Sequence, residues 1–177
     1  MSYRRFIVMF STASLIALTA WAGIAVMAQD AGSGQRAPAQ ITADLKDEHG
    51  RTALMRAALK GDRADVQGLL DGGADVNATT EAGVTALMLA AGEGHAEVLQ
   101  TLIAKSADVN ARTPGGYTAL MCAALNGHTD AVRVLLDNGA DVTIKDTSDQ
   151  TALKYAESKA HTEIIELLTR AGNKSSQ

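Results

Sequence analysis

The sequence predicts an all-α solenoid of paired antiparallel helices with projecting loops. The main observation is a pattern that recurs every 33 residues, which is typical of a repeat architecture. The apolar positions after residue 28 are also almost entirely aliphatic, with alanine the most frequent, and this favours short packed helices over a sheet sandwich. The recurring positions include the threonines Thr52, Thr85, Thr118 and Thr151 and the alanines Ala57, Ala90, Ala123 and Ala156.

The first helix of each copy is expected to run from the threonine to a glycine nine residues later. The threonine hydroxyl can accept a hydrogen bond from an otherwise unpaired backbone N–H, and the glycine can end the helix in the left-handed conformation. Gly61, Gly94 and Gly127 hold this place in three copies. Ala160 holds it in the fourth, and Ser106 replaces a glycine that follows a second helix. Each replacement should cost about 1 kcal/mol if the left-handed conformation is kept.

The second helix of each copy is expected to bury one aliphatic stripe, because its apolar residues have the i, i+3, i+4 spacing of a core-facing helix. Gly73, Gly139 and Gly172 are expected to end these helices, and about ten residues then project toward the next threonine. The stripes are Val66, Leu69 and Leu70; Val98, Leu99, Leu102 and Ile103; Val132, Leu135 and Leu136; and Ile164, Ile165, Leu167 and Leu168.

Several motifs together resemble the ankyrin repeat. They are the 33-residue period, the Thr-x-Leu-x-x-Ala start, the Gly-His pair and the Gly-Ala-Asp-Val-Asn ending, and they cover residues 50–173. The resemblance implies helix pairs stacked so that each unit contacts only its neighbours. It divides the chain into repeats at 50–82, 83–115 and 116–148, a shortened C-terminal capping repeat at 149–173 and a tail at 174–177. Where the family prefers Pro and His in its Thr-Pro-Leu-His start, this chain has alanine and methionine in three copies.

The first 28 residues are expected to be an export signal. Arg4 and Arg5 form a positive start, no charge follows up to Ala28, and the small residues there suit cleavage before Gln29. The alternative is an uncleaved anchor over residues 6–28, since 23 helical residues span about 34 Å. Residues 29–49 are expected to form a tether and an N-terminal cap. The whole resembles exported bacterial ankyrin-repeat proteins, which implies the periplasm, or the inner membrane facing the periplasm if the anchor stays.

Charge argues against nucleic acid as a partner. The chain has 16 Lys and Arg, two of which lie in the export segment, so the rest carries 14 against 20 Asp and Glu and a net charge of −6. Such a chain has no basic stripe, and after residue 28 its only aromatic side chains are Tyr117 and Tyr155. Cys122 is the only cysteine, so an internal disulfide is excluded and stability must come from packing.

The residues that could carry chemistry are expected to have structural roles. His95, His128 and His161 recur once per repeat and would not converge on one metal ion, so hydrogen bonding within the stack is expected. Cys122 is expected to be packed in the interior, not to act as a nucleophile. The recurring aspartates, which are Asp75, Asp108 and Asp141, are expected to stabilise turns. We therefore expect no catalytic, cofactor-binding or metal-binding residues, no cofactor and no enzymatic activity.

A variable stripe on the loop tips and the exposed side of the first helices is the predicted binding site. In the ankyrin family, partners usually lie against these positions, and here they change from copy to copy while the framework repeats. Tyr117 is the expected anchor, since it is one of the two aromatic residues after residue 28 and it follows Pro114. The predicted partner-binding residues are Glu48, His49, Arg51, Lys60, Glu81, Val84, Glu93, Pro114, Tyr117, Asn126, Thr147, Gln150 and Lys159.

The sequence therefore predicts an exported module that binds another protein and no small-molecule substrate. A membrane-tethered scaffold in the periplasm, with residues 6–28 retained, is the alternative. The membrane is expected as a partner only in that second case.

Overall fold

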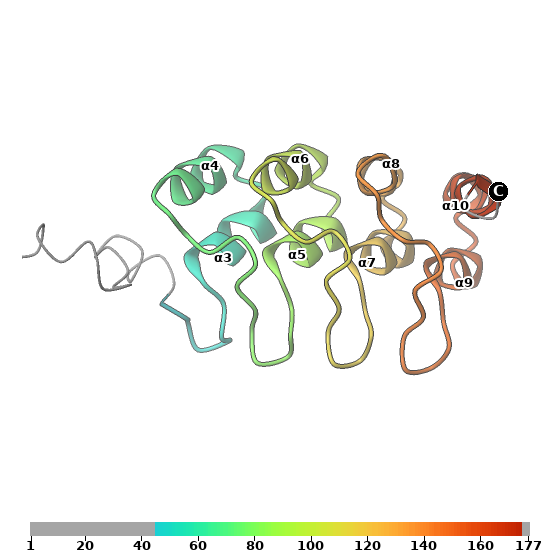
Figure 1. The fold of residues 1–177 in the computed structure, drawn as a ribbon, viewed down its shortest axis with the longest axis horizontal. Helices are drawn as coiled ribbons and strands as arrows, with labels where there is room; N and C mark the ends of the chain where they lie inside the picture. Colours follow the sequence, from blue (N-terminus) through green and yellow to red (C-terminus); the bar gives the residue numbers. More distant parts are fainter. Residues whose placement is uncertain (1–44, 175–177) are drawn as a thin grey trace, which may run out of the picture. The chain divides into compact units, whose positions relative to one another are not determined.

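The computed structural model describes residues 45–174, and eight α-helices fill this range (Figure 1). The predicted all-α solenoid of paired helices is confirmed, because the only β-type pairing among these residues is the isolated bridge between Thr79 and Thr85. The predicted export segment and most of the predicted tether lie outside the described residues. The helices are α3 (Ala53–Lys60), α4 (Arg63–Asp71), α5 (Ala86–Gly92), α6 (Ala96–Ala104), α7 (Ala119–Asn126), α8 (Thr129–Asp137), α9 (Ala152–Ser158) and α10 (Thr162–Lys174).

The helices form two rows. Figure 1 shows α3, α5, α7 and α9 side by side in one row and α4, α6, α8 and α10 in the other, with the connecting loops projecting beyond the first row. Each helix contacts its partner in the same repeat and its counterpart in the adjacent repeat. The first helices and the loop tips therefore lie along one side of the stack.

The recurring threonine begins every first helix, as expected. The hydroxyls of Thr52, Thr85, Thr118 and Thr151 accept a hydrogen bond from the backbone N–H three residues later at 3.2–3.4 Å. This satisfies one backbone donor that a helix start leaves unpaired. The three residues Thr52, Thr85 and Thr118 are also buried, so the cap lies inside the stack.

The left-handed positions are kept even where glycine is missing. Ser106 has a φ of 66° and Ala160 a φ of 59°, so the left-handed conformation, which is unfavourable for residues other than glycine, is kept at both. Asp149, with a φ of 63°, is a third such residue and occupies a loop position held by glycine in the other repeats. One expectation was wrong: Gly172 does not end the last helix, because α10 continues through it to Lys174.

The histidines connect adjacent repeats, as predicted. The Nε2 atoms of His95, His128 and His161 lie 2.9–3.3 Å from backbone oxygens of the preceding repeat, those of Leu59, Gly92 and Leu125 respectively. Each ring also packs against the glycine that ends the preceding first helix: a Cβ added to Gly94 would lie 2.6 Å from His128 Nδ1. This contact explains why glycine and histidine recur together.

Asparagines form a second set of bridges at the turns after the second helices. The Asn77 side chain accepts from the Asp108 N–H at 2.8 Å, and Asn110 accepts from the Asp141 N–H at 2.9 Å. The recurring aspartates stabilise these turns: the carboxylate of Asp108 accepts from the Asn110 N–H at 2.9 Å. The repeats are thus joined by hydrogen bonds at two levels as well as by packing.

The core is aliphatic, with its largest buried side chains supplied by leucine, methionine, isoleucine and valine. Methionines at the position where the family prefers histidine, Met55, Met88 and Met121, are buried and fill this core. The end repeats expose polar residues, including Asp65 in α4 and Glu163 in α10. Within residues 45–174, no helix is long and apolar enough to cross a membrane.

Candidate functional site

The predicted partner-binding residues all belong to the loops or to the first-helix row. Apart from Arg51, Val84 and Gln150, which are half-buried, they are exposed, and Tyr117 keeps 39% of its surface accessible. Tyr117 and Leu45 are the large apolar side chains exposed among the described residues. The exposed set is Glu48, His49, Lys60, Glu81, Glu93, Pro114, Tyr117, Asn126, Thr147 and Lys159.

Some of these side chains already have partners within the chain. Arg51 Nε donates to the Asp47 carboxylate at 3.2 Å, Asn126 Nδ2 donates to the Gly92 carbonyl at 2.7 Å, and Gln150 Nε2 donates to the Ser148 carbonyl at 3.1 Å. A partner protein would have to compete for these groups. Asn126 in particular holds two repeats together.

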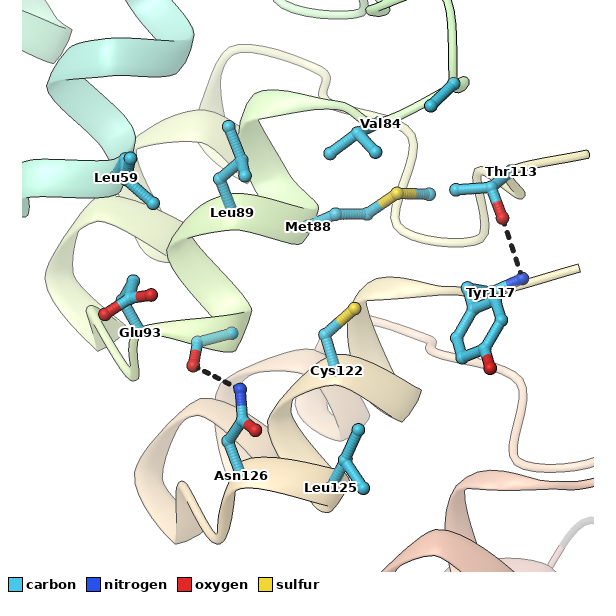
Figure 2. A pocket seen from close by; sticks show the side chains of 12 residues that line it. Leu59, Val84, Met88, Leu89, Glu93, Thr113, Tyr117, Cys122, Leu125 and Asn126 are labelled. Atoms are coloured by element: carbon cyan, nitrogen blue, oxygen red, sulfur yellow. Dashed lines mark hydrogen bonds between the residues drawn. The ribbon is translucent and has the colours of Figure 1, made fainter. Parts of the chain in front are cut away.

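An open apolar groove lies between α5 and α7, in the middle of this side of the stack (Figure 2). Its volume is about 430 Å³. The structure brings four predicted residues together there, and the other nine lie outside the groove. The lining residues are Leu59, Ala82, Val84, Met88, Leu89, Gly92, Glu93, Thr113, Tyr117, Cys122, Leu125 and Asn126.

Sequence reasoning missed the floor of this groove. Leu89 of α5 and Cys122 of α7 occupy the same repeat position, which is Arg56 in the first repeat and Tyr155 in the last. This position is half-buried in all four repeats. The signal that could have identified it is the change of residue type from copy to copy, the same criterion that selected Tyr117.

At this repeat position, the first and last repeats form a polar contact between helix and loop, and the two central repeats do not. In the first repeat Asp47 pairs with Arg56 at 3.6 Å, and in the last Asp146 accepts from the Tyr155 hydroxyl at 2.5 Å. In the two central repeats the loop position of these aspartates holds threonine, and the helix position facing it holds Leu89 or Cys122. In the central repeats, threonine thus replaces the aspartate of the loop where the helix lacks the arginine or tyrosine that would pair with it. The groove between α5 and α7 is therefore apolar at this position.

The aspartate at the last loop is buried although it is charged. Asp146 is 7% exposed, and its Oδ1 also accepts from the backbone N–H groups of Ser148 and Gln150 at 2.8 Å. The Tyr155 hydroxyl, followed by the Gln150 N–H, holds the pKa of Asp146 below its ordinary value. The same carboxylate raises the pKa of Tyr155 above that of a free tyrosine.

The two tyrosines form one unit beside the groove. The rings of Tyr117 and Tyr155 have centroids 5.8 Å apart at an angle of 34°, and their hydroxyl oxygens share a hydrogen bond at 3.1 Å. Tyr117 also donates its backbone N–H to the Thr113 hydroxyl at 3.1 Å, as Figure 2 shows. The Tyr117 ring is therefore fixed before any partner arrives.

Cys122 is half-buried and lines the groove, so the expectation that it packs in the interior is only partly correct. Burial raises the pKa of its thiol, which lowers its nucleophilicity at neutral pH. Among residues 45–174, no three His, Cys, Asp or Glu side chains are placed to hold a metal ion. The chemistry that this side of the stack offers is contact with apolar and polar groups of another molecule.

The comparisons with known proteins agree with the geometry. No curated protein matches the chain. A family model described as ankyrin repeats (3 copies) matches residues 54–146 and again residues 87–177, so that the two matches together span all four helix pairs. The chain belongs to the ankyrin-repeat family.

Proposed function

We propose that this chain is an exported, non-enzymatic module that binds another protein through its first helices and loop tips. Ankyrin repeats suggest a protein–protein interaction module. The observation that carries the proposal is the open groove between α5 and α7, bordered by the exposed side chain of Tyr117. An apolar depression with a fixed aromatic residue at its edge is the kind of surface that interface anchors occupy.

The back of the stack offers a different surface. Three ion pairs connect adjacent repeats on the side of α4, α6, α8 and α10: Arg63 with Glu97 at 3.4 Å, Lys105 with Asp71 at 2.7 Å, and Arg133 with Glu163 at 2.6 Å. A partner on that side would have to break these contacts. The first-helix side is therefore the proposed binding face, with the thirteen residues predicted from the sequence and the groove floor as its members.

Photo-cross-linking in the host tests the binding face. A photoreactive amino acid at Glu93, on the groove edge, should give a covalent adduct with a partner protein, and one at Gln100, exposed on α6, should give none. The outcome that defeats the proposal is the reverse pattern, with adducts from Gln100 and none from Glu93, Glu81 or Pro114.

Export is the second part of the proposal, and the first 28 residues support it, since a positive start precedes an uncharged stretch that ends at Ala28. We place the mature chain in a bacterial periplasm. Mass measurement of the protein from its host separates the two forms: a chain that begins at Gln29 is the soluble module. An intact chain in the membrane fraction is the tethered scaffold, and a cytoplasmic chain with its N-terminus intact rejects both.

A further inference from the structure

One of the residues that line the groove has no side chain. Gly92, the last residue of α5, occupies the position of Leu59 in the first repeat and Leu125 in the third, and both leucines line the groove. A Cβ added at Gly92 would meet only Asn126 Nδ2 at 3.6 Å and Cys122 Cβ at 3.9 Å, which are ordinary van der Waals distances. The backbone at this position therefore does not demand glycine.

Gly94 provides the contrast two residues later. Its φ is 78°, and an added Cβ would collide with the His128 ring at 2.6 Å, so the fold requires glycine there. At Gly92 neither reason applies, and glycine in a helix is less favourable than alanine or leucine. A residue that weakens its own helix and opens a depression on the binding face is best explained by what enters the depression.

The lining defines the chemistry of that occupant. Val84, Met88 and Leu89 contribute the side of α5, and Cys122 and Leu125 contribute the side of α7, so the interior takes an apolar group. The polar atoms at the edge are already paired: the Thr113 hydroxyl accepts from the Tyr117 N–H, and the Asn126 amide donates to Gly92. A hydrogen-bonding ligand group would find few partners in the groove.

Charge at the edge adds a second requirement. Glu93 borders the groove and Glu81 lies next to the lining residue Ala82. Within residues 45–174, neither carboxylate makes a hydrogen bond or ion pair, so both are open to a cation from outside. The net charge of −6 after residue 28 also favours a positively charged partner segment.

We propose that the groove over Gly92 binds a peptide segment of the partner protein that inserts one aliphatic or methionine side chain and pairs an adjacent Lys or Arg with Glu93. The proposal rests on the proposed function, because it names the chemistry of the partner at the same face. Gly92 is then the residue that determines specificity, since leucine holds its position in the repeats on either side.

The substitution Gly92→Leu tests the groove, because it places in this repeat the residue that its neighbours already have. The matched control is Gly68→Leu on α4, where an added Cβ meets nothing within 4 Å and the helix gains the same residue type. Both variants should fold at least as well as the parent, as measured by circular dichroism and urea unfolding. In the absence of ligand, Gly92→Leu alone should slow alkylation of Cys122 by iodoacetamide, since the new side chain covers the thiol.

The probe is a random dodecapeptide library displayed on phage and selected against the chain purified from its host. We expect enriched peptides to share an aliphatic or methionine residue next to Lys or Arg. Their affinity should fall about tenfold or more in Gly92→Leu, as expected for excluding a buried aliphatic side chain, and should not change in Gly68→Leu. Glu93→Gln should weaken them by about twofold to fivefold, and only at low salt, because Glu93 is exposed.

Three outcomes overturn the inference: no enriched peptides, enriched peptides without the apolar and basic pair, or equal binding to Gly92→Leu and the parent. The cross-linking experiment separates this failure from failure of the proposed function. If the photoreactive group at Glu81 still captures the host partner in the Gly92→Leu background, the binding face stands and the groove chemistry is wrong. If the parent gives adducts only from the back of the stack, the binding face itself is wrong.

Discussion

The Tyr155 hydroxyl donates a hydrogen bond of 2.5 Å to the carboxylate of Asp146, a residue that is 7% exposed. This contact joins the last loop to α9, the first helix of the last repeat. It also holds the Tyr117 ring through the hydrogen bond between the two tyrosine hydroxyls. One pair of residues thus stabilises the C-terminal end of the stack and positions the edge of the groove.

Replacing Tyr155 by phenylalanine should therefore destabilise the protein. The change removes the hydrogen bond from the Tyr155 hydroxyl to the Asp146 carboxylate and keeps the ring, so the loss is about 1.5 to 3 kcal/mol, the usual net contribution of a hydrogen bond to a charged group. Urea unfolding followed by circular dichroism measures it. The control is Tyr117→Phe, which removes only the bond between the hydroxyls and should have a smaller effect. An unchanged unfolding midpoint in Tyr155→Phe would show that the contact does not contribute.

The dependence of stability on pH should change when Asp146 is replaced by asparagine. The folded pKa of Asp146 lies below the ordinary value of 3.8, so the carboxylate stabilises the fold above that pH. This contribution is lost as the pH falls through the folded pKa. The difference in free energy of unfolding between the parent and Asp146→Asn should thus shrink as the pH falls from 7 to 3. A constant difference between the two proteins over this range would contradict the assignment.

Two neighbouring glycines should respond in opposite ways to alanine. Gly94→Ala places a Cβ 2.6 Å from the His128 ring on a backbone with a φ of 78°, and should cost about 2 kcal/mol or more. Gly92→Ala meets only ordinary contacts and should be neutral or stabilise by up to about 1 kcal/mol. Thermal unfolding of the two variants side by side provides the comparison. Equal destabilisation would mean that Gly92 is required by the fold, which would remove the basis for the groove argument.

Glycine should improve stability where the chain is strained without it. Ala160 and Ser106 have φ values of 59° and 66°, in the left-handed region. Ala160→Gly and Ser106→Gly should each raise the free energy of unfolding by about 0.5 to 1 kcal/mol. Ala104→Gly, at the end of α6, is the control and should lower it. If Ala160→Gly and Ser106→Gly also lower the free energy of unfolding, the entropy that glycine adds to the unfolded chain outweighs the relief of backbone strain.

Removing residues 149–177 should cause aggregation. α9 packs against α7 and α10 against α8, so the deletion exposes apolar side chains of the third repeat. Terminal repeats with polar outer sides keep repeat stacks soluble. Light scattering and dye binding to exposed apolar surface would detect the change. A truncated chain that stays monomeric and helical would show that the last repeat is dispensable as a cap.

The sequence predicts the fold almost completely because the repeat is local. Thr52 and its equivalents are adjacent to the helices they cap, and His95 bonds to the repeat just before it, so a 33-residue pattern records these contacts. Gly172 was the exception: the repeat pattern predicts a helix end there, but α10 continues through Gly172 to Lys174.

The groove could not be predicted in the same way, because it is made by what is absent. Gly92 is one of several helix-end glycines in the sequence, and only the packing of α5 on α7 shows that the missing leucine leaves a space. The burial of Asp146 was also hidden, since its partner Tyr155 occupies a position that holds arginine, leucine or cysteine in the other repeats. Deviations from a repeat become interpretable only when the neighbouring copies are placed beside them.

Partner binding should depend on Tyr117 and not on the back of the stack. Tyr117→Ala removes a ring that is held in place by Tyr155 and Thr113, and should weaken binding of the cross-linked partner by about 2 kcal/mol, roughly thirtyfold. A control on the back of the stack should not break a contact between repeats, such as the ion pair of Arg133 with Glu163 at 2.6 Å. Gln100→Ala on α6 should leave affinity unchanged, and Tyr117→Phe should retain most of it. If Gln100→Ala abolishes binding while Tyr117→Ala has no effect, the partner lies on the second-helix side and the binding face must be reassigned.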